Sequence, residues 1–343
     1  MSTGPGTAPT TLPPPPSASP LDPTLHLLRA ELERRCPANA VGVDAMGHQA
    51  MLPAGKLLRP LLFTEAAAAV GMRREDTLTA ALGVESLHVG SLVHDDIIDG
   101  DDLRRGRPTV VARHGLPNAI VTGDALICGA FRAVAECADG TIPGERQLAV
   151  VRVLADAGVD LCRGQAMEDE LRGDPGCGLD RYMTMIELKT GALFRAACLG
   201  GALLAGASPG AQAALTRFAE HLGRAFQMTD DLLPHTSDTE TSGKSVLSDI
   251  GNGRPTLPVL ICWQRAGASG RERLTAALSG AVPADAALDD LRAVLSETGA
   301  LEQARAETLA ESRRASSALL DLPDTTARDT LAAVADLSVN RGL

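Results

Sequence analysis

The chain has 343 residues, enough to bury a substantial apolar core in one large domain or two. Aromatic residues make up only 2%, Ala and Leu are abundant, and β-branched residues form no alternating runs, so the composition predicts an all-helical fold. The net charge of -11 argues against a nucleic-acid-binding protein, because such a protein needs basic residues to neutralise phosphates.

The seven cysteines include no CxxC pair, so we expect reduced, small core residues of a cytoplasmic protein. No run of about 18 apolar residues is present. The N-terminus also lacks a basic patch followed by an apolar segment. We therefore expect neither a transmembrane segment nor a secretory signal.

Residues 1–22 are rich in Pro, Thr, Ser and Gly, and four consecutive prolines occupy 13–16. Such a segment predicts a disordered, partly polyproline II tail, followed by a single helical domain over 23–343. Two interpretations of the tail stay open. It is either an inert extension or a docking peptide for another protein or a protein shell.

Apolar periodicity and the residues that start and stop helices define the expected elements. In chain order, helices are predicted over 22–37, 55–71, 76–99, 118–137, 145–171, 180–207, 209–233, 257–265, 284–297, 301–320 and 325–337. Pro234 has no amide hydrogen and disfavours helical geometry at Leu233, so the helix before it should stop or kink there. A polar loop is expected over 235–254.

An acidic cluster lies at the end of the predicted helix over 76–99. Glu85, His88, Leu92, Asp95 and Asp99 are spaced by three and four residues and therefore share one helix face, which Asp96 borders. Carboxylates this close repel one another unless a cation sits among them. Because all the candidate ligands are oxygens, the cluster favours Mg²⁺ or Ca²⁺.

Basic residues follow the acids directly, at Arg104, Arg105 and Arg107. Guanidiniums beside a metal-binding cluster indicate a metal-bridged phosphate or diphosphate. A second acidic pair, Asp230 and Asp231, ends the predicted helix over 209–233.

The ordered set of motifs resembles the trans-polyprenyl diphosphate synthases. The matching stretches are GKLLRP at 55–60, HDDIID at 94–99, LRRGRPT at 103–109, GDAL at 123–126, GQ at 164–165, KTG at 189–191, FQMTDD at 226–231, GKS at 243–245 and GRPTLP at 253–258. The resemblance implies an all-α isoprenoid-synthase-type bundle of ten or more helices around a deep central cavity. It also implies a homodimeric enzyme that condenses isopentenyl diphosphate with an allylic diphosphate.

The same resemblance implies roles for individual residues that match the family motifs. Asp95, Asp99 and Asp230 would be metal ligands, supported by Asp96 and Asp231. The isopentenyl diphosphate site would contain Lys56, Arg59, His88 and Arg105. The allylic diphosphate would be held by Arg104, Lys189, Lys244 and Arg254. Thr190 and Gln227 would line the reacting carbons.

One position departs from the family pattern. The second acidic motif normally has an acid at its fifth position, where this chain has Pro234. The resemblance implies three Mg²⁺ per active site, and the departure affects the third of them or its surroundings. Asp238, four residues further on, is a candidate substitute. We expect activity that needs a raised Mg²⁺ concentration.

Product length in this family depends on side chains about one turn before the first acid. Gly90 and Ser91 occupy these positions and are too small to block a growing chain, so Leu87 and adjoining helices should set the limit. These residues favour a geranylgeranyl (C20) product, with C15 and longer products as alternatives. Gly90→Phe is expected to shorten the product.

Two other functions compete with chain elongation. A class I terpene cyclase would need a second metal motif of Asn or Asp, Ser or Thr, and Glu, which the helix ending at Asp230 lacks, and more aromatic side chains than this chain has. A non-catalytic prenyl-diphosphate-binding or regulatory subunit would explain both Pro234 and the Pro-rich tail.

Overall fold

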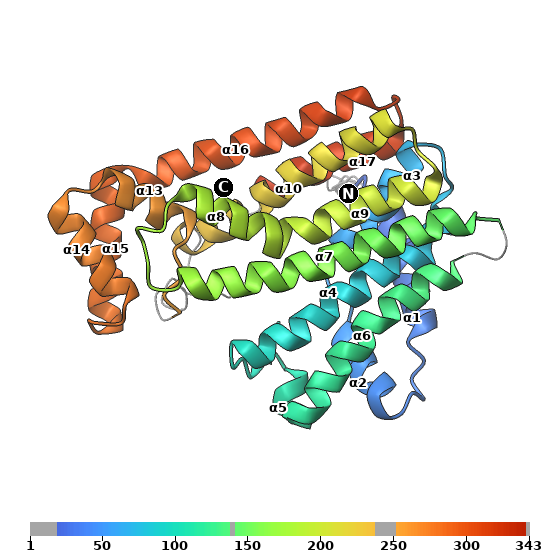
Figure 1. The fold of residues 1–343 in the computed structure, drawn as a ribbon, viewed down its shortest axis with the longest axis horizontal. Coiled ribbons are helices and arrows are strands. Elements are labelled where there is room, and N and C mark those ends of the chain that lie inside the picture. Colours follow the sequence, from blue (N-terminus) through green and yellow to red (C-terminus); the bar gives the residue numbers. More distant parts are fainter. Residues whose placement is uncertain (1–18, 138–140, 237–251, 341–343) are drawn as a thin grey trace, which may run out of the picture.

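The computed structural model describes residues 19–137, 141–236 and 252–340 (Figure 1). Within these ranges the chain is helical apart from turns and one short hairpin, so the all-α prediction is confirmed. The first 18 residues of the predicted tail lie outside the described ranges, and α1 (Asp22–Arg35) begins where the sequence predicts, with a proline in its first turn.

The other N-terminal and central elements are α2 (Gly42–Met51), α3 (Leu58–Ala69), η1 (Arg74–Thr77), α4 (Leu78–Ile98), β1 (Leu103–Arg104), β2 (Arg107–Pro108), α5 (Val110–His114), α6 (Leu116–Glu136), α7 (Gly144–Leu171), α8 (Leu179–Ile186), η2 (Glu187–Gly191), α9 (Ala192–Ala205) and α10 (Pro209–Thr236). The C-terminal elements are α13 (Leu257–Arg265), α14 (Ala268–Leu278), α15 (Ala284–Thr298), α16 (Ala300–Ala318), η3 (Leu319–Asp321) and α17 (Thr326–Val339). The sequence analysis missed α2, α5 and α14. It also read α8, η2 and α9 as one regular helix.

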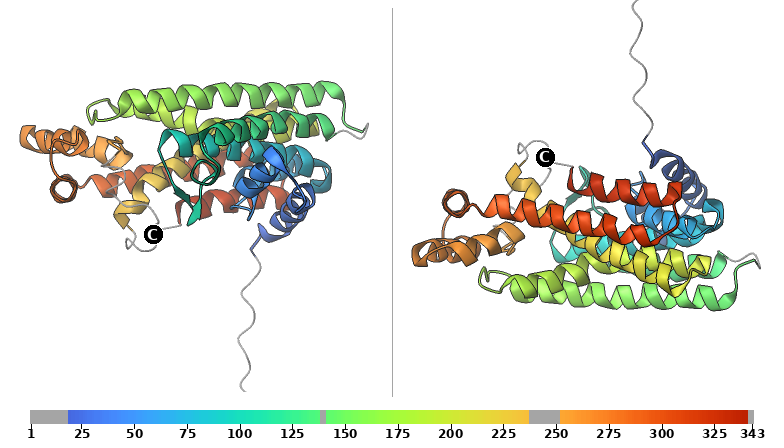
Figure 2. Two further views of the ribbon diagram at one scale, coloured as in Figure 1. Left: turned by 90° about the horizontal axis from the view of Figure 1, so that it is seen from below. Right: turned by 90° about the horizontal axis from the view of Figure 1, so that it is seen from above.

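The helices pack in layers around α9 and α10. Figure 2 shows α7 along one outer side and α16 with α17 along the opposite side, while α13, α14 and α15 project at one end (Figures 1 and 2). The largest apolar cluster joins α1, α3, α4, α9, α10 and α17, and a second cluster joins α8 and the end of α10 to α13, α14, α15 and α16. The largest cluster includes α4 residues only as far as Val89, and the acid-bearing end of α4 packs on a small separate cluster of Val93, Val110 and Ala119.

Gly90 corrects the expectation about product length. A Cβ atom on this residue would lie 2.9 Å from both the carbonyl oxygen of Gly123 and Cγ1 of Ile127 on α6. The glycine thus permits close packing of α4 on α6, and there is no open space at Gly90 itself. Because a large side chain here would push the two helices apart, Gly90→Phe would test stability and not product length.

Two segments bear on the expectation that no stretch crosses a membrane, although length and composition alone are weak evidence for a span. Leu116–Glu136 and Leu179–Ala205 are long and apolar enough by length and composition. The second has 61% of its most apolar window buried and belongs to the protein core, whereas the first has only 28% buried. The cysteines also differ from the prediction, because Cys198 and Cys262 are buried but Cys128 and Cys162 are exposed.

Candidate active site

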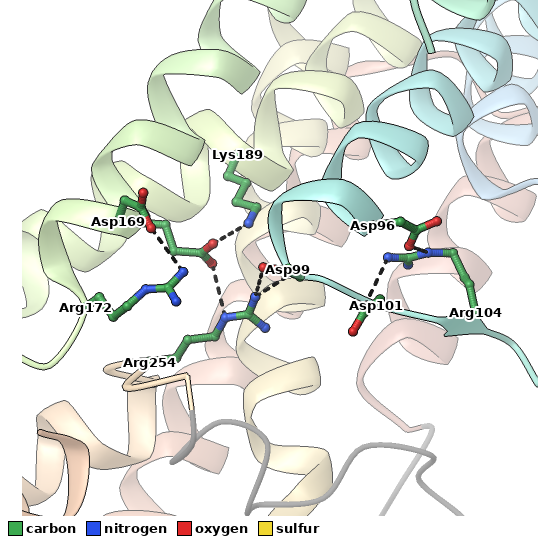
Figure 3. Close-up of polar contacts among 9 residues, drawn as sticks. Asp96, Asp99, Asp101, Arg104, Asp169, Arg172, Lys189 and Arg254 are labelled. Atoms are coloured by element: carbon green, nitrogen blue, oxygen red, sulfur yellow. Dashed lines mark hydrogen bonds and ion pairs between the residues drawn. The ribbon is translucent and has the colours of Figure 1, made fainter. Parts of the chain in front are cut away.

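Two acids of the first cluster, Asp99 and Asp96, each pair with a different arginine. Asp99 faces Arg254, whose Nη2 lies 3.1 Å from Oδ2 of Asp99, while Asp96 accepts a hydrogen bond of 2.5 Å from Nε of Arg104 (Figure 3). Asp96 is only 3% exposed, and Arg104 also lies 3.8 Å from Asp101. Asp96 therefore anchors the loop after α4, and it points away from Asp99.

Asp95 is half-buried at the same helix end. Burial raises the pKa of its carboxyl above the usual range, and the nearby Lys189 opposes this shift while Asp99 adds to it. Burial also raises the pKa of Asp96, an effect that the hydrogen bond from Arg104 counteracts. Asp95 and Asp99 thus form a partly desolvated pair of like charges, an arrangement that a divalent cation stabilises.

The two acids of the second pair, Asp230 and Asp231, have different surroundings. Asp231 is 8% exposed and accepts three hydrogen bonds: 2.6 Å from the hydroxyl of Tyr182, 3.0 Å from the amide of Leu257, and 3.0 Å from Nε2 of Gln227. Burial and then Asp231 raise the pKa of Tyr182 well above its usual value, so the hydroxyl stays protonated and donates. Asp231 ties α10 to α8 and α13, which leaves the half-buried Asp230 as the acid near Arg59.

Lys189 and Arg254 both contact Glu168, a carboxylate that was not among the predicted site residues. Glu168 on α7 accepts a 2.5 Å hydrogen bond from Nζ of Lys189, and its Oε1 lies 3.8 Å from Nε of Arg254. Figure 3 shows Lys189, Arg254 and Asp99 directed toward one another. Glu168 therefore holds both cations beside Asp95 and Asp99. It lies three residues after the GQ motif, but no local pattern identifies its partners.

A second basic group lies between α3 and α4. Nη1 of Arg59 is 3.0 Å from Nε2 of His88, and its guanidinium stacks over Phe194 at 5.1 Å from the ring centre. Burial lowers the pKa of Arg59 to about 10, so it stays charged at neutral pH. Burial, together with Arg59 and Arg105, lowers the pKa of His88 well below its usual value, and its imidazole is therefore neutral.

The remaining predicted residues of the basic group lie nearby. The guanidinium of Arg105 occupies the space beside the backbone of Gly55, next to the exposed Lys56. Burial raises the pKa of Glu85, while Arg59 and Arg105 counteract the shift. The structure thus brings Lys56, Arg59, His88 and Arg105 into one group, as the sequence predicts.

Thr190 and Gln227, which are predicted to line the reacting carbons, contact each other. The Thr190 hydroxyl donates to Oε1 of Gln227 at 2.8 Å, and Gln227 in turn donates to Asp231. This chain of hydrogen bonds fixes which oxygen each side chain presents. Lys244 and Asp238 lie outside the described residues, so their predicted roles stay predictions.

Of the two predicted effects of Pro234, a stop or a kink, the stop is wrong. The helix α10 continues through this proline to Thr236. Proline removes one amide donor, a cost that tertiary packing can offset, and Pro234 is itself buried. The tether from Asp231 to the first residue of α13 holds the same turn in place. Helix disruption is therefore no reason to assign the chain a non-catalytic role.

The oxygen ligands suit a divalent cation. In the described part of the chain, no three His, Cys, Asp or Glu side chains gather closely enough to hold a metal alone. Mg²⁺ is usually bound by one or two carboxylates together with water and substrate phosphates. Asp95, Asp99 and Asp230 fit that mode, because basic residues for a diphosphate stand beside them.

The fold and these acidic and basic groups define a helical enzyme that binds diphosphates. The family model for polyprenyl synthetase matches residues 42–295. The chain therefore belongs to the polyprenyl synthetase family and is a prenyltransferase of the polyprenyl diphosphate synthase class.

Similar proteins differ in the product that they are named for. A short chain isoprenyl diphosphate synthase of Methanothermobacter thermautotrophicus is 37% identical, covering 84% of this chain and 86% of its own length. An octaprenyl diphosphate synthase of Haemophilus influenzae is 30% identical, covering 93% and 94%.

Solved structures agree with the fold. A geranylgeranyl pyrophosphate synthetase from Pyrococcus horikoshii superposes with a TM-score of 0.86 and 31% identity over 94% of this chain and 97% of that one. A polyprenyl synthase from Caulobacter crescentus, complexed with calcium and isoprenyl diphosphate, has a TM-score of 0.83 and 28% identity over 96% and 100%. These relatives leave the product length of this chain open.

Proposed function

We propose that the protein condenses isopentenyl diphosphate with an allylic diphosphate and releases mainly geranylgeranyl diphosphate. The proposal rests mainly on one observation: two separate groups of basic side chains lie next to the acids at the ends of α4 and α10. Lys189 and Arg254 stand beside Asp95 and Asp99, while Arg59 stands between His88 and Asp230. Two basic groups suit two diphosphates.

The acids have two different roles, which follow from the residues that each one contacts. Asp95, Asp99 and Asp230 would hold Mg²⁺, with three ions per site as the family resemblance implies. When bound, the metal neutralises charge that develops on the departing diphosphate. Asp96 and Asp231 would hold the ends of the two helices in place, since Asp96 accepts a hydrogen bond from Arg104 and Asp231 accepts one from Tyr182.

In the reaction, Lys189 and Arg254 bind the allylic diphosphate. Arg104 and Lys244, which are also predicted to contact it, complete this group. The allylic carbon–oxygen bond breaks, and the oxygens of Thr190 and Gln227 face the resulting cation. The isopentenyl double bond supplies the electron pair for the new carbon–carbon bond. Loss of one proton to the released diphosphate then gives a chain five carbons longer.

Isopentenyl diphosphate would be bound by Lys56, Arg59 and Arg105, with the neutral His88 as a hydrogen-bonding partner. Arg59 remains a cation at neutral pH, since its pKa is about 10. A pocket of about 130 Å³ lies against Arg105, with Leu92 and Val89 of α4 in its wall. Arg104 and Arg107 also line this pocket, whereas Lys56, Arg59 and His88 do not, so it lies beside the proposed isopentenyl diphosphate group and not within it.

The test is an incubation of the purified chain with isopentenyl diphosphate, each allylic primer and a titration of Mg²⁺, with products identified by mass. We expect Mg²⁺-dependent elongation to C20, half-saturated at a raised Mg²⁺ concentration. No turnover of any primer at any Mg²⁺ concentration would contradict the proposal and favour a binding or regulatory subunit. A main product of C15 or of a longer chain would change only the assigned length.

Ser91 is the better position at which to test product length. It lies one turn before Asp95 on the same face of α4, it is half-buried, and its hydroxyl donates to the carbonyl of His88 at 2.8 Å. We expect Ser91→Phe to shift the main product from C20 to C15, because the larger ring would block the growing chain. Ser91→Ala is the matched control and should keep the C20 product.

We also propose a homodimer formed through α6. Ile120 and Val121 on this helix are 43% and 49% exposed, and Leu148 on α7 is 51% exposed. Exposed apolar faces of this kind are typical of protein interfaces. We expect sedimentation at the dimer mass, and a shift to the monomer in Val121→Glu. Leu320→Glu, at a position that is 75% exposed on η3, is the control and should leave the dimer intact.

The Pro-rich tail would serve as a docking peptide for another protein or a protein shell. Deletion of residues 1–20 should then leave turnover unchanged. A large loss of activity in the truncated protein would assign the tail to the catalytic unit instead.

A further inference from the structure

Lys189 and Thr190 lie on an irregular turn. The five residues of η2 form a π-helical turn between the regular helices α8 and α9. Such turns are rare, interrupt the i to i+4 pattern, and occur frequently at functional sites. The surrounding structure must therefore hold this one in place.

The first residue of the turn is held from both sides. Oε1 of Glu187 accepts hydrogen bonds from Arg224 on α10, at 2.8 Å from Nε and 2.6 Å from Nη2. The backbone carbonyl of Glu187 accepts a 3.3 Å hydrogen bond from Nη1 of Arg195. Arg195 is fixed in turn by Asp160 on α7, at 3.0 Å. Two guanidiniums thus connect the turn to α7 and α10.

Arg224 is itself anchored to α16. Its Nη1 lies 3.7 Å from Oε2 of Glu311, a carboxylate that is only 8% exposed. His221, one turn earlier on α10, places Nδ1 at 2.7 Å from the same oxygen, and Arg314 pairs with the other carboxylate oxygen. This charged network is centred on one buried carboxylate, Glu311, so that removing Arg224 would take away one of its partners.

The backbone of the turn is also enclosed. A Cβ atom on Gly164 of α7 would collide with the backbone nitrogen and Cα of Lys189, and one on Gly223 of α10 would lie 2.9 Å from Cα of Gly191. Both neighbouring helices therefore touch the main chain of the turn directly. From this enclosed turn Lys189 reaches Glu168 and Thr190 reaches Gln227.

We propose that Glu187, Arg195 and Arg224 are positioning residues, which hold the π turn so that Lys189 and Thr190 face the allylic diphosphate. This inference rests on the proposed function of the site. None of the three residues is assigned to touch substrate. Their effect is transmitted through the backbone of the turn, and it should fall on the allylic substrate more than on isopentenyl diphosphate.

Direct binding tests the inference separately from catalysis. The probe is geranyl S-thiolodiphosphate, a slowly reacting allylic analogue, titrated calorimetrically in the presence of Mg²⁺. We expect Arg224→Gln to weaken its binding by about tenfold or more, because small misplacements of positioning groups have effects of this order. In turnover assays, KM for isopentenyl diphosphate should stay within about twofold. Arg224→Lys should recover part of the loss.

Arg217→Gln is the matched control. Arg217 lies on the same helix and makes a comparable ion pair, 2.6 Å from Asp321, but both side chains are largely exposed. This variant should bind the analogue as the unaltered protein does. Equal binding by Arg224→Gln and Arg217→Gln would overturn the inference, even if the unaltered protein elongates prenyl chains.

A double-mutant cycle distinguishes positioning from general destabilisation. If Arg224 acts through the turn, its replacement should weaken binding about tenfold in the native background but by less than about twofold in a Lys189→Gln background. Additive losses would overturn the inference. If Arg224→Gln fails to fold, Glu187→Gln supplies the same comparison. Should the unaltered protein bind the analogue without elongating it, the proposed function fails, and the cycle still decides the role of the turn.

Discussion

Replacing Asp95 with Asn should lower kcat/KM by about 1,000-fold while leaving the fold intact. The carboxylate would hold metal that neutralises the departing diphosphate, and an amide supplies no negative charge to bind it. Asn has nearly the same shape, so packing at the end of α4 is preserved. Since burial raises the pKa of Asp95, its charged form is already disfavoured in the folded protein, and the neutral amide should not lower the melting temperature.

The measurement is turnover of an allylic primer over a range of Mg²⁺ concentrations, together with thermal unfolding of the same preparation. Asp102→Asn is the control, because Asp102 is exposed a few residues further along the chain. It removes the same charge and should change kcat/KM by less than about twofold. Activity of Asp95→Asn within threefold of the native value would remove Asp95 from the metal site.

The helices and the acidic face could be predicted because their signals are local. The spacing of Asp95 and Asp99 places them on one face of any regular helix, and Pro or Gly marks most helix ends. The motif order also identified the family before any tertiary contact was known. The missed helices α2, α5 and α14 are short, and their periodic patterns are correspondingly weak.

The direction of each acid could not be predicted, because it depends on a distant partner. Asp96 is paired with Arg104 across a turn, and Asp231 is held by Tyr182 from 49 positions earlier in the chain. Glu168 gives no local signal for the same reason, since its partner Arg254 belongs to another part of the fold. Sequence spacing identifies a group of carboxylates, whereas packing decides which of them are left to bind a cation.

Small residues were misread for a related reason. The small size of Gly90 suggests open space behind the acids, but α6 packs directly against this residue. A glycine indicates either a void or a close approach of another element, and only the tertiary structure distinguishes the two. Ser91, which is half-buried on the same face of α4 as Asp95, remains the candidate determinant of product length.

Asp231→Ala should destabilise the protein by about 3–5 kcal/mol, because each buried donor that loses its acceptor costs about 1–3 kcal/mol. Three donors would lose their acceptor: the Tyr182 hydroxyl, the Leu257 amide, and the Gln227 side chain. Turnover should fall as well, because Gln227 orients the hydroxyl of Thr190. Urea unfolding followed by circular dichroism measures the stability change.

Tyr182→Phe provides the comparison, because it removes one donor and keeps the ring. It should destabilise by about 1 kcal/mol, the usual net value of one hydrogen bond. A different pattern would result if Asp231 acted chiefly on the metal: Asp231→Ala would then keep its stability within about 1 kcal/mol while the Mg²⁺ requirement rose. A large loss of stability would show that the Asp231 carboxylate holds the site together, and a raised Mg²⁺ requirement would show that it binds the cation. The sequence motif alone does not distinguish these two roles.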